Sequence, residues 1–494
     1  MMLMRNMKTL ASLFNKVLLK LSNHPVHFFA ITSLIFGLLF VLLVPPFQNP
    51  DEYTHFTRSY EVSELKISHK YRQGSVYIKG SELPSSIYNT NKKTRLYHKQ
   101  GQPDVPQAKK YTWEETEKAA DIPLSKSHKE VYDTNAFPAY VPLIYIPQAA
   151  VIKILNFINT PIIYMLYAVR FVNLIVWIVL AALSLHILRP SKRKLALAGI
   201  LLIPMFIAQA ASPGVDGLLT GLTLLFLAIV SNVIFEKEKL SHKKLITLTG
   251  ILTLMVMAKP VYIAFGLLVF IIPTRWRGLR SFIYKSFIVV LPFVVYVAWS
   301  LLTKEKGSIY VEGVAISNAD PSAQAAYIIP HFFNFVEPFV NTLALGWGDG
   351  IGWSLIGTFG KLDTPLPLMF IVLGYILVFA GIFAGVNERE EIHNRKNLYT
   401  NKLALLTLLA LVIYTVGVYL SMYIFSTPPR TKVITGVQGR YLLPILPMLT
   451  LFITKHLVTL RERAYVAVMT LIPLTLLVAS VIIIFLRYYV FYPQ

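Results

Sequence analysis

"PIIYMLYAVRFVNLIVWIVLAALSLHILRPSKRK" runs from residue 161 to 194, and it decides the class of fold. Its first part, 161–188, is almost continuously apolar, and about 20 such residues in a helix are enough to cross the hydrocarbon core of a bilayer. Its last part, 189–194, is rich in Lys and Arg. An apolar run that ends in cations is typical of a transmembrane helix followed by a cytoplasmic loop.

The composition extends this interpretation to the whole chain. Hydrophobic residues make up 55% of the 494 residues, and the mean hydropathy is +0.57, which is far above the range of soluble proteins. The sequence therefore predicts an all-α polytopic membrane protein with about 11 transmembrane helices. The expected spans are 27–46, 161–188, 195–211, 217–235, 244–258, 260–273, 286–303, 366–386, 402–424, 441–458 and 464–488.

One further apolar stretch, 136–158, is not counted as a span. It contains Pro138, Pro142 and Pro147, each of which removes a backbone hydrogen bond or kinks a helix. Counting it would also place "RPSKRK" and every later basic loop outside the cell, against the positive-inside rule. We therefore expect a re-entrant or interfacial helix here.

The charge balance predicts the orientation. The chain has 47 Lys and Arg against 25 Asp and Glu, a net charge of +22. In so apolar a chain this excess indicates basic loops facing an anionic leaflet, and not a nucleic-acid partner. The absence of cysteine excludes disulfides and thiolate metal sites. The expected layout is a cytoplasmic tail at 1–26, a transmembrane module at 27–303 with an outer loop at 47–135 that bears juxtamembrane helices, an outer loop at 304–365, and C-terminal transmembrane helices at 366–494.

Unusual polar residues gather on the predicted outer face. They are Asp51, Glu52, His55 and Arg58 after the first span, Asp216 and Lys259 in two short turns, and Arg440 with Tyr441 at the start of the tenth span. Ionisable groups at a bilayer boundary are costly and tend to mark a site. A Lys or Arg at a helix end is nevertheless often an anchor, and Asp216 is an ordinary helix N-cap by position. Asp51 and Glu52 are harder to explain in this way, because adjacent carboxylates repel each other.

Several motifs carry a family resemblance. "PPFQNPDEYTHF", "MAKPVYI", "GKLDTPLP" and "GVQGRYLLP" resemble the signatures of a bacterial membrane family described as domain of unknown function 2142 (DUF2142). Over about the first 300 residues, the order of short motifs also resembles the GT-C class of membrane glycosyltransferases, such as the lipid A aminoarabinose transferase and the protein O-mannosyltransferases. The GT-C resemblance implies a GT-C-like fold and a site on the outer face of a bacterial plasma membrane.

The same resemblance implies an activity and roles for the residues. The chain would transfer a sugar from a polyprenyl-phosphate donor to a cell-surface glycan, teichoic-acid-like or lipid acceptor, and the expected outcome is inversion at the anomeric carbon. Asp51 would be the general base, Glu52 would help to bind the acceptor or a metal, and Asp216 would orient the acceptor. The phosphate and the rest of the substrate would be bound by Arg58, Lys259, Arg440, Tyr441 and His55. The sequence does not identify a cofactor. The candidate is a divalent cation, Mg²⁺ or Mn²⁺, bound by Asp51, Glu52 and Asp216.

Two aromatic residues and one cation complete the predicted site. Trp347 and Trp353 lie in a Gly-rich segment and would stack on sugar faces, although interfacial Trp is common at a bilayer rim. Lys153 is an alternative phosphate partner, because Phe137 and Pro138 stand where the aminoarabinose transferase has a cation.

A transporter or lipid-linked oligosaccharide flippase is the main alternative function, and a non-catalytic assembly factor is another. The sequence contains no P-loop, no Rossmann glycine pattern and no G-x-S-x-G elbow. Transporters often show two related halves and a site at the membrane midplane. Here no internal repeat is evident, and the polar residues cluster on one predicted face, which favours a transferase.

Overall fold

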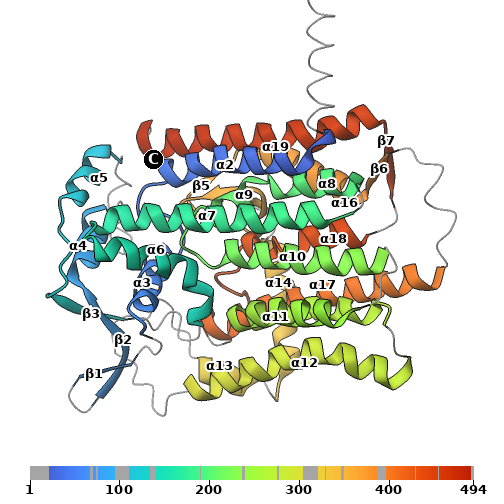
Figure 1. Cartoon of the computed structure of the whole chain (residues 1–494), viewed down its shortest axis with the longest axis horizontal. Coiled ribbons are helices and arrows are strands. Elements are labelled where there is room, and N and C mark those ends of the chain that lie inside the picture. Colours follow the sequence, from blue (N-terminus) through green and yellow to red (C-terminus); the bar gives the residue numbers. More distant parts are fainter. Residues whose placement is uncertain are drawn as a thin grey trace, which may run out of the picture.

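The computed structural model shows a mostly helical protein in which long helices lie side by side (Figure 1). The residues that it describes are 22–66, 70–73, 76–94, 111–133, 141–189, 191–235, 240–274, 277–303, 321–328, 330–346, 350–386, 397–428, 430–453 and 456–490.

Six helical segments of the described chain are long and apolar enough to cross a membrane. They are α2 (Pro25–Leu43), α7 (Ile162–Ile187), α10 (Asp216–Phe235), most of α12 (Gly278–Thr303), most of α17 (Asn397–Ser426), and α19 (Glu462–Phe485) with the π-helical turn η5 (Leu486–Val490). The chain is therefore a multi-pass helical membrane protein, as the sequence predicts.

The remaining predicted spans are also helical, but each is short or bent. They are α8 (Ser191–Leu201) with α9 (Pro204–Ala210), α11 (His242–Ala258), η2 (Pro260–Ile271), α16 (Leu368–Phe383), and η4 (Gly439–Leu442) with α18 (Ile445–Phe452). The break between α8 and α9 bends the chain by 64°, and the pair would count as a seventh crossing if it forms one span. Proline explains the breaks, because Pro204 and Pro260 begin new helical segments and cannot donate to the preceding turn.

One end of the helix bundle is covered by the segments that follow α2 (Figure 1). These are α3 (Glu52–Ser63), β1 (Lys70–Gln73), β2 (Val76–Pro84), α4 (Ser85–Thr94), α5 (Trp113–Ala120) and β3 (Lys129–Asp133), followed by η1 (Pro142–Tyr145) and α6 (Ile146–Phe157). The strands form an antiparallel sheet in the order β1-β2-β3, which the prediction of an all-α chain did not include.

Short elements fill the second half of the chain between the long helices. They are α13 (Pro321–Ile328), η3 (Phe332–Phe335), α14 (Val336–Gly346), α15 (Ile351–Ile356), the antiparallel pair β4 (Thr358–Phe359) and β5 (Thr364–Pro365), and the parallel pair β6 (Ala384–Val386) and β7 (Val458–Leu460).

The core is a continuous apolar cluster to which most of the long helices contribute. Phe29 of α2 packs edge-on against Trp177 of α7, with ring centroids 5.3 Å apart. In contrast, α12 exposes large apolar side chains such as Leu279 and Phe282. Exposed apolar surface of this kind suits contact with lipid chains and not with water.

Candidate functional site

The chain leaves α2 in a strained turn that carries Asp51. Phe47 and Asp51 both have positive φ angles, 60° and 58°, a conformation that costs a non-glycine residue free energy. The turn is closed by Glu52, whose carboxylate accepts hydrogen bonds from the backbone N–H of Asn49 at 3.1 Å and from its side-chain amide at 3.3 Å. Asp51 therefore stands at a backbone position that its neighbours hold in place.

Asp51 forms an ion pair with Arg440, which lies in the first turn of the helical segment η4. The Arg440 Nη2 atom lies 3.0 Å from the Asp51 Oδ2 atom. The side chain of Asp51 is 44% exposed, whereas that of Arg440 is only 5% exposed. Gln209 accepts a further hydrogen bond from Arg440 at 3.4 Å. The carboxylate of this pair is therefore accessible, and the guanidinium is buried and held by Gln209.

A second acid–cation pair joins Asp216, at the start of α10, to Lys259, at the end of α11. Both side chains are mostly buried. Tyr441 connects the two pairs, because its ring lies 5.1 Å from Lys259 Nζ and 5.2 Å from Arg440 Cζ. These cation–π contacts hold two positive charges close to one another and to both acids.

Two glycines allow these elements to approach closely. A Cβ atom at Gly439 would overlap the backbone of α15, at the carbonyl of Ile351 and the N–H of Leu355. A Cβ atom at Gly217 would lie 2.8 Å from the Cα atom of Ala210 in α9. Each glycine is the direct neighbour of a site residue, Arg440 or Asp216, so the site depends on tight backbone packing.

His55 lies among these charged groups. Its Nδ1 atom is 2.8 Å from the hydroxyl of Tyr145, which belongs to η1. Burial lowers the pKa of His55 to about 4, although the nearby carboxylates of Asp51 and Asp216 act in the opposite direction. The imidazole is therefore neutral at pH 7, and it offers the site a hydrogen-bonding group without a charge.

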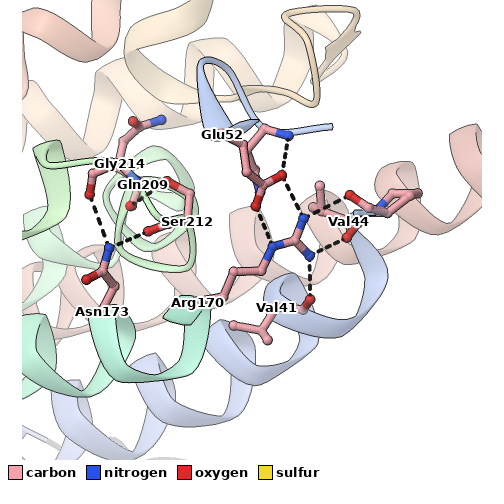
Figure 2. A network of polar contacts seen from close by, with 10 residues as sticks. Val41, Val44, Glu52, Arg170, Asn173, Gln209, Ser212 and Gly214 are labelled. Atoms are coloured by element: carbon pink, nitrogen blue, oxygen red, sulfur yellow. Dashed lines mark hydrogen bonds and ion pairs between the residues drawn. The ribbon is translucent and has the colours of Figure 1, made fainter. Parts of the chain in front are cut away.

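Glu52 and Arg58 are directed into the protein and away from this cluster. Glu52 is fully buried and is bound by Arg170 of α7, with Nε–Oε1 and Nη2–Oε2 distances of 2.6 and 2.8 Å (Figure 2). Arg58 is buried beside Glu61, at 2.8 Å. The two adjacent acids of the sequence thus have different surroundings, because Asp51 precedes α3 and Glu52 is its first residue.

The three carboxylates considered for a divalent ion are not gathered around one point in the structure. Each is bound to its own cation, Asp51 to Arg440, Glu52 to Arg170 and Asp216 to Lys259. Within the described part of the chain, no group of three or more His, Asp or Glu side chains is arranged to hold a metal ion. A hard cation needs about six oxygen ligands, which these separated acids do not supply together.

Polar residues of α7 that the sequence analysis did not assign to the site contact the segments around it (Figure 2). Besides binding Glu52, Arg170 donates hydrogen bonds to the carbonyls of Val41, Val44 and Pro45 at 2.7–2.9 Å. One turn further on, Asn173 donates to the carbonyls of Ser212 and Gly214, at 2.6 and 3.2 Å. The signal in the sequence was the presence of Arg and Asn inside an apolar span, where polar groups are costly.

A small pocket lies beside the Asp51 turn. It is lined by Asn49 and Pro50 of the turn, by Gln209 of α9, by Thr358 of β4 and by Gly360 of the "GKLD" motif, together with apolar side chains. Asp363 of that motif pairs with Arg487 of η5 at 2.6 Å. The pocket thus connects the Asp51 turn to a motif that the sequence analysis linked to the family but not to the site.

The remaining predicted site residues do not join the cluster. Trp353 donates its indole N–H to the carbonyl of Leu366 at 2.7 Å and is partly buried. Lys153 is exposed on α6. Trp347, Phe137 and Pro138 lie outside the described residues.

The comparisons with known proteins agree with the membrane architecture. No curated protein and no solved structure is significantly similar to the chain. The model of one family, described as "Predicted membrane protein (DUF2142)", matches residues 34–449, which include every residue of the cluster around Asp51. The chain therefore belongs to the DUF2142 family of predicted membrane proteins.

Proposed function

We propose that this protein is a membrane glycosyltransferase that moves a sugar from a polyprenyl-phosphate donor to a glycan, teichoic-acid-like or lipid acceptor at the cell surface. The main support is the half-exposed carboxylate of Asp51 beside two closely spaced cations, Arg440 and Lys259. A transfer of this kind needs a base for the acceptor and positive charge for the leaving phosphate.

In the proposed reaction, Asp51 takes the proton from an acceptor hydroxyl while that oxygen attacks the anomeric carbon of the donor. The bond between the anomeric carbon and the phosphate oxygen breaks, and the polyprenyl phosphate leaves with the bonding electrons. Attack on the face opposite the leaving group inverts the configuration. Arg440 and Lys259 stabilise the negative charge that develops on the phosphate.

Asp51 is paired with Arg440 in the structure. A phosphate that binds Arg440 competes with the carboxylate for the same guanidinium, and it thereby frees Asp51 to accept a proton. His55 and Tyr441 contribute neutral contacts to the bound sugar phosphate. Glu52 and Arg58 have no direct role in this proposal, because both are buried in ion pairs, and no step uses a metal ion.

The proposal includes a topology. The chain crosses a bacterial plasma membrane about eleven times in a GT-C-like arrangement, with the shorter and bent helices counted as crossings, the N-terminus in the cytoplasm and the site outside. Its support is that Asp216, Lys259 and Arg440 lie at the ends of apolar helical segments, and that Asp51 lies in the turn between the apolar helix α2 and α3. A site at that level reaches a phosphate held at the bilayer surface.

The proposal is tested with the purified full chain in liposomes that contain undecaprenyl-phosphate-linked glucose, galactose or mannose, with an extract of cell-envelope glycans and lipids added as the source of acceptor. Release of free undecaprenyl phosphate is measured, since it reports cleavage of the donor whatever the acceptor. We expect release from at least one donor by the wild-type protein and much less by Asp51→Asn. Movement of an intact sugar lipid between leaflets without cleavage would instead identify a flippase.

A further inference from the structure

We propose that Arg170 and Asn173 are positioning residues that hold the two acids of the site, Asp51 and Asp216, at a fixed separation. This inference rests on the proposed function. The two residues are three positions apart on α7, so their side chains leave the same face of the helix. Figure 2 shows that Arg170 is directed to the Asp51 turn and Asn173 to the loop before Asp216.

Arg170 uses its guanidinium to join α2 to the Asp51 turn. Two of its nitrogens bind both carboxylate oxygens of Glu52, and the three remaining hydrogen bonds go to backbone carbonyls at and just beyond the C-terminal end of α2. Val41 lies in the last turn of α2, where carbonyls lack intrahelical partners and carry partial negative charge, and Val44 and Pro45 directly follow the helix. A single buried side chain therefore fixes where α2 ends and where α3 begins.

The position of Asp51 follows from this contact. Glu52 is its direct neighbour, and the Glu52 carboxylate also binds the amides of Asn49, on the other side of Asp51. The strained conformation of Asp51, with φ at 58°, persists only if its surroundings hold it. Arg170 thus holds, through Glu52, the backbone that presents the Asp51 carboxylate to Arg440.

Asn173 has the corresponding role for the second acid. Its side-chain amide binds the carbonyls of Ser212 and Gly214, which lie just before Asp216 at the start of α10. The Ser212 hydroxyl in turn donates to the carbonyl of Gln209 at 3.1 Å. Because the Gln209 side chain accepts a hydrogen bond from Arg440, the chain of contacts leads back to the partner of Asp51.

Arg170 acts through other residues, since its side chain is fully buried and contacts no accessible surface. Stability alone is a weak explanation for such a pair, because the desolvation of two buried charges offsets most of their attraction. Hydrophobic replacement of both partners commonly preserves stability, but it would not hold the turn in the same geometry. A positioning role and a purely structural role therefore predict different results for the same double substitution.

The absence of cysteine from the chain gives a measurement that does not depend on transfer. Gln48→Cys places a single thiol in the Asp51 turn, at a side chain that is buried and makes no hydrogen bond to any residue the structure describes. We expect slow modification by a maleimide in the otherwise wild-type chain. Adding Arg170→Gln should raise the rate at least tenfold, and adding Arg170→Lys should raise it less, because Lys keeps the charge and part of the hydrogen bonding.

The same variants without the Gln48 substitution are assayed for release of undecaprenyl phosphate. We expect Arg170→Gln and Asn173→Leu to lower kcat at least tenfold with little change in KM. The matched control is Asn232→Leu, since the Asn232 amide also binds a backbone carbonyl at a helix end, that of Ile187 at 2.7 Å, but at the opposite end of α7. The control should leave the labelling rate and kcat unchanged.

A double variant that replaces both partners with apolar side chains, Glu52→Leu with Arg170→Leu, keeps the test decisive if a single change prevents folding. A positioning role predicts normal thermal stability with low kcat and fast labelling. Normal kcat in a folded double variant, or unchanged labelling after Arg170→Gln, would overturn the inference. Fast labelling in Arg170→Gln, combined with no donor cleavage by the wild-type chain, would support the anchoring of the turn and refute only the proposed function.

Discussion

Asp51 and Arg440 are 389 positions apart in the sequence, and their side chains meet at 3.0 Å with the acid exposed and the cation buried. This asymmetry matters for the proposed chemistry. A ligand can reach the carboxylate without any rearrangement of Arg440, whose other contacts with Gln209 and Tyr441 keep it in place. The pair therefore provides an accessible base and a fixed positive charge at one point.

Asp51→Asn tests the base directly. The substitution keeps the size of the side chain and its ability to bind Arg440 through the amide oxygen, but it removes the proton acceptor. We expect donor cleavage to fall by roughly 10² to 10⁴ while expression, stability and donor binding persist. The measurement is the initial rate of undecaprenyl phosphate release at saturating donor.

The control for this prediction is Asp121→Asn, which removes an exposed carboxylate next to α5 that belongs to no site contact. It should cleave the donor at the wild-type rate. Near-normal cleavage by Asp51→Asn would exclude Asp51 as the base and remove the main support for an enzyme.

The predicted orientation can be tested with single cysteines, again because the chain has none of its own. Asp121→Cys lies in the segment between α2 and α6, and Lys243→Cys lies at the start of α11; both positions are exposed. In intact cells a membrane-impermeant maleimide should label the first and not the second, and both should react after the membrane is permeabilised. Labelling of Lys243→Cys alone in intact cells would show that the chain has the orientation opposite to the predicted one.

Much of the fold follows from the sequence, since hydrophobic runs and prolines act locally. Each of the eleven predicted spans overlaps a helical segment, and the described part of the proline-rich segment before α7 is also helical, as η1 and α6. The sequence analysis did not predict the bend between α8 and α9, because the apolar run 195–211 is continuous in the sequence. In the structure, Pro204 begins a new helix at that point. The strands β1 to β3 were missed because their sequences lack the alternation of a half-buried strand.

The candidate site was predictable only as a set of residues. Ionisable side chains at helix ends identified Asp51, Asp216, Lys259 and Arg440, but the pairing among them depends on tertiary contacts that no local pattern encodes. The adjacent acids show this most clearly. Glu52 directly follows Asp51 in the sequence. Its side chain nevertheless points into the protein, because it binds the buried Arg170, which lies 118 residues further along the chain.

His55 predicts a dependence of stability on pH. Burial lowers its pKa from 6.5 to about 4 in the folded protein, so the unfolded chain binds a proton at higher pH than the folded chain does. The contribution to stability is complete above about pH 6.5, declines as the pH falls, and is lost below about pH 4; it is on the order of 3 kcal/mol. The thermal midpoint of the wild-type protein in detergent should fall over this window, and that of His55→Gln should fall less. Equal slopes for the two proteins would contradict a buried neutral His55.

The last prediction concerns the cations that would bind the donor phosphate. Lys259→Met and Arg440→Gln each remove one positive charge while keeping much of the side-chain volume. Loss of a hydrogen bond to a charged group costs about 1.5 to 3 kcal/mol, so the KM for the polyprenyl-phosphate sugar should rise roughly 10- to 100-fold in each variant. Lys432→Met is the matched control, because Lys432 also pairs with a carboxylate, that of Glu337 at 3.8 Å, but is almost fully exposed. Since an exposed pair of this kind contributes little, its KM should stay at the wild-type value. An unchanged KM in both Lys259→Met and Arg440→Gln would leave these residues as structural partners of Asp216 and Asp51, and the phosphate would have to bind elsewhere.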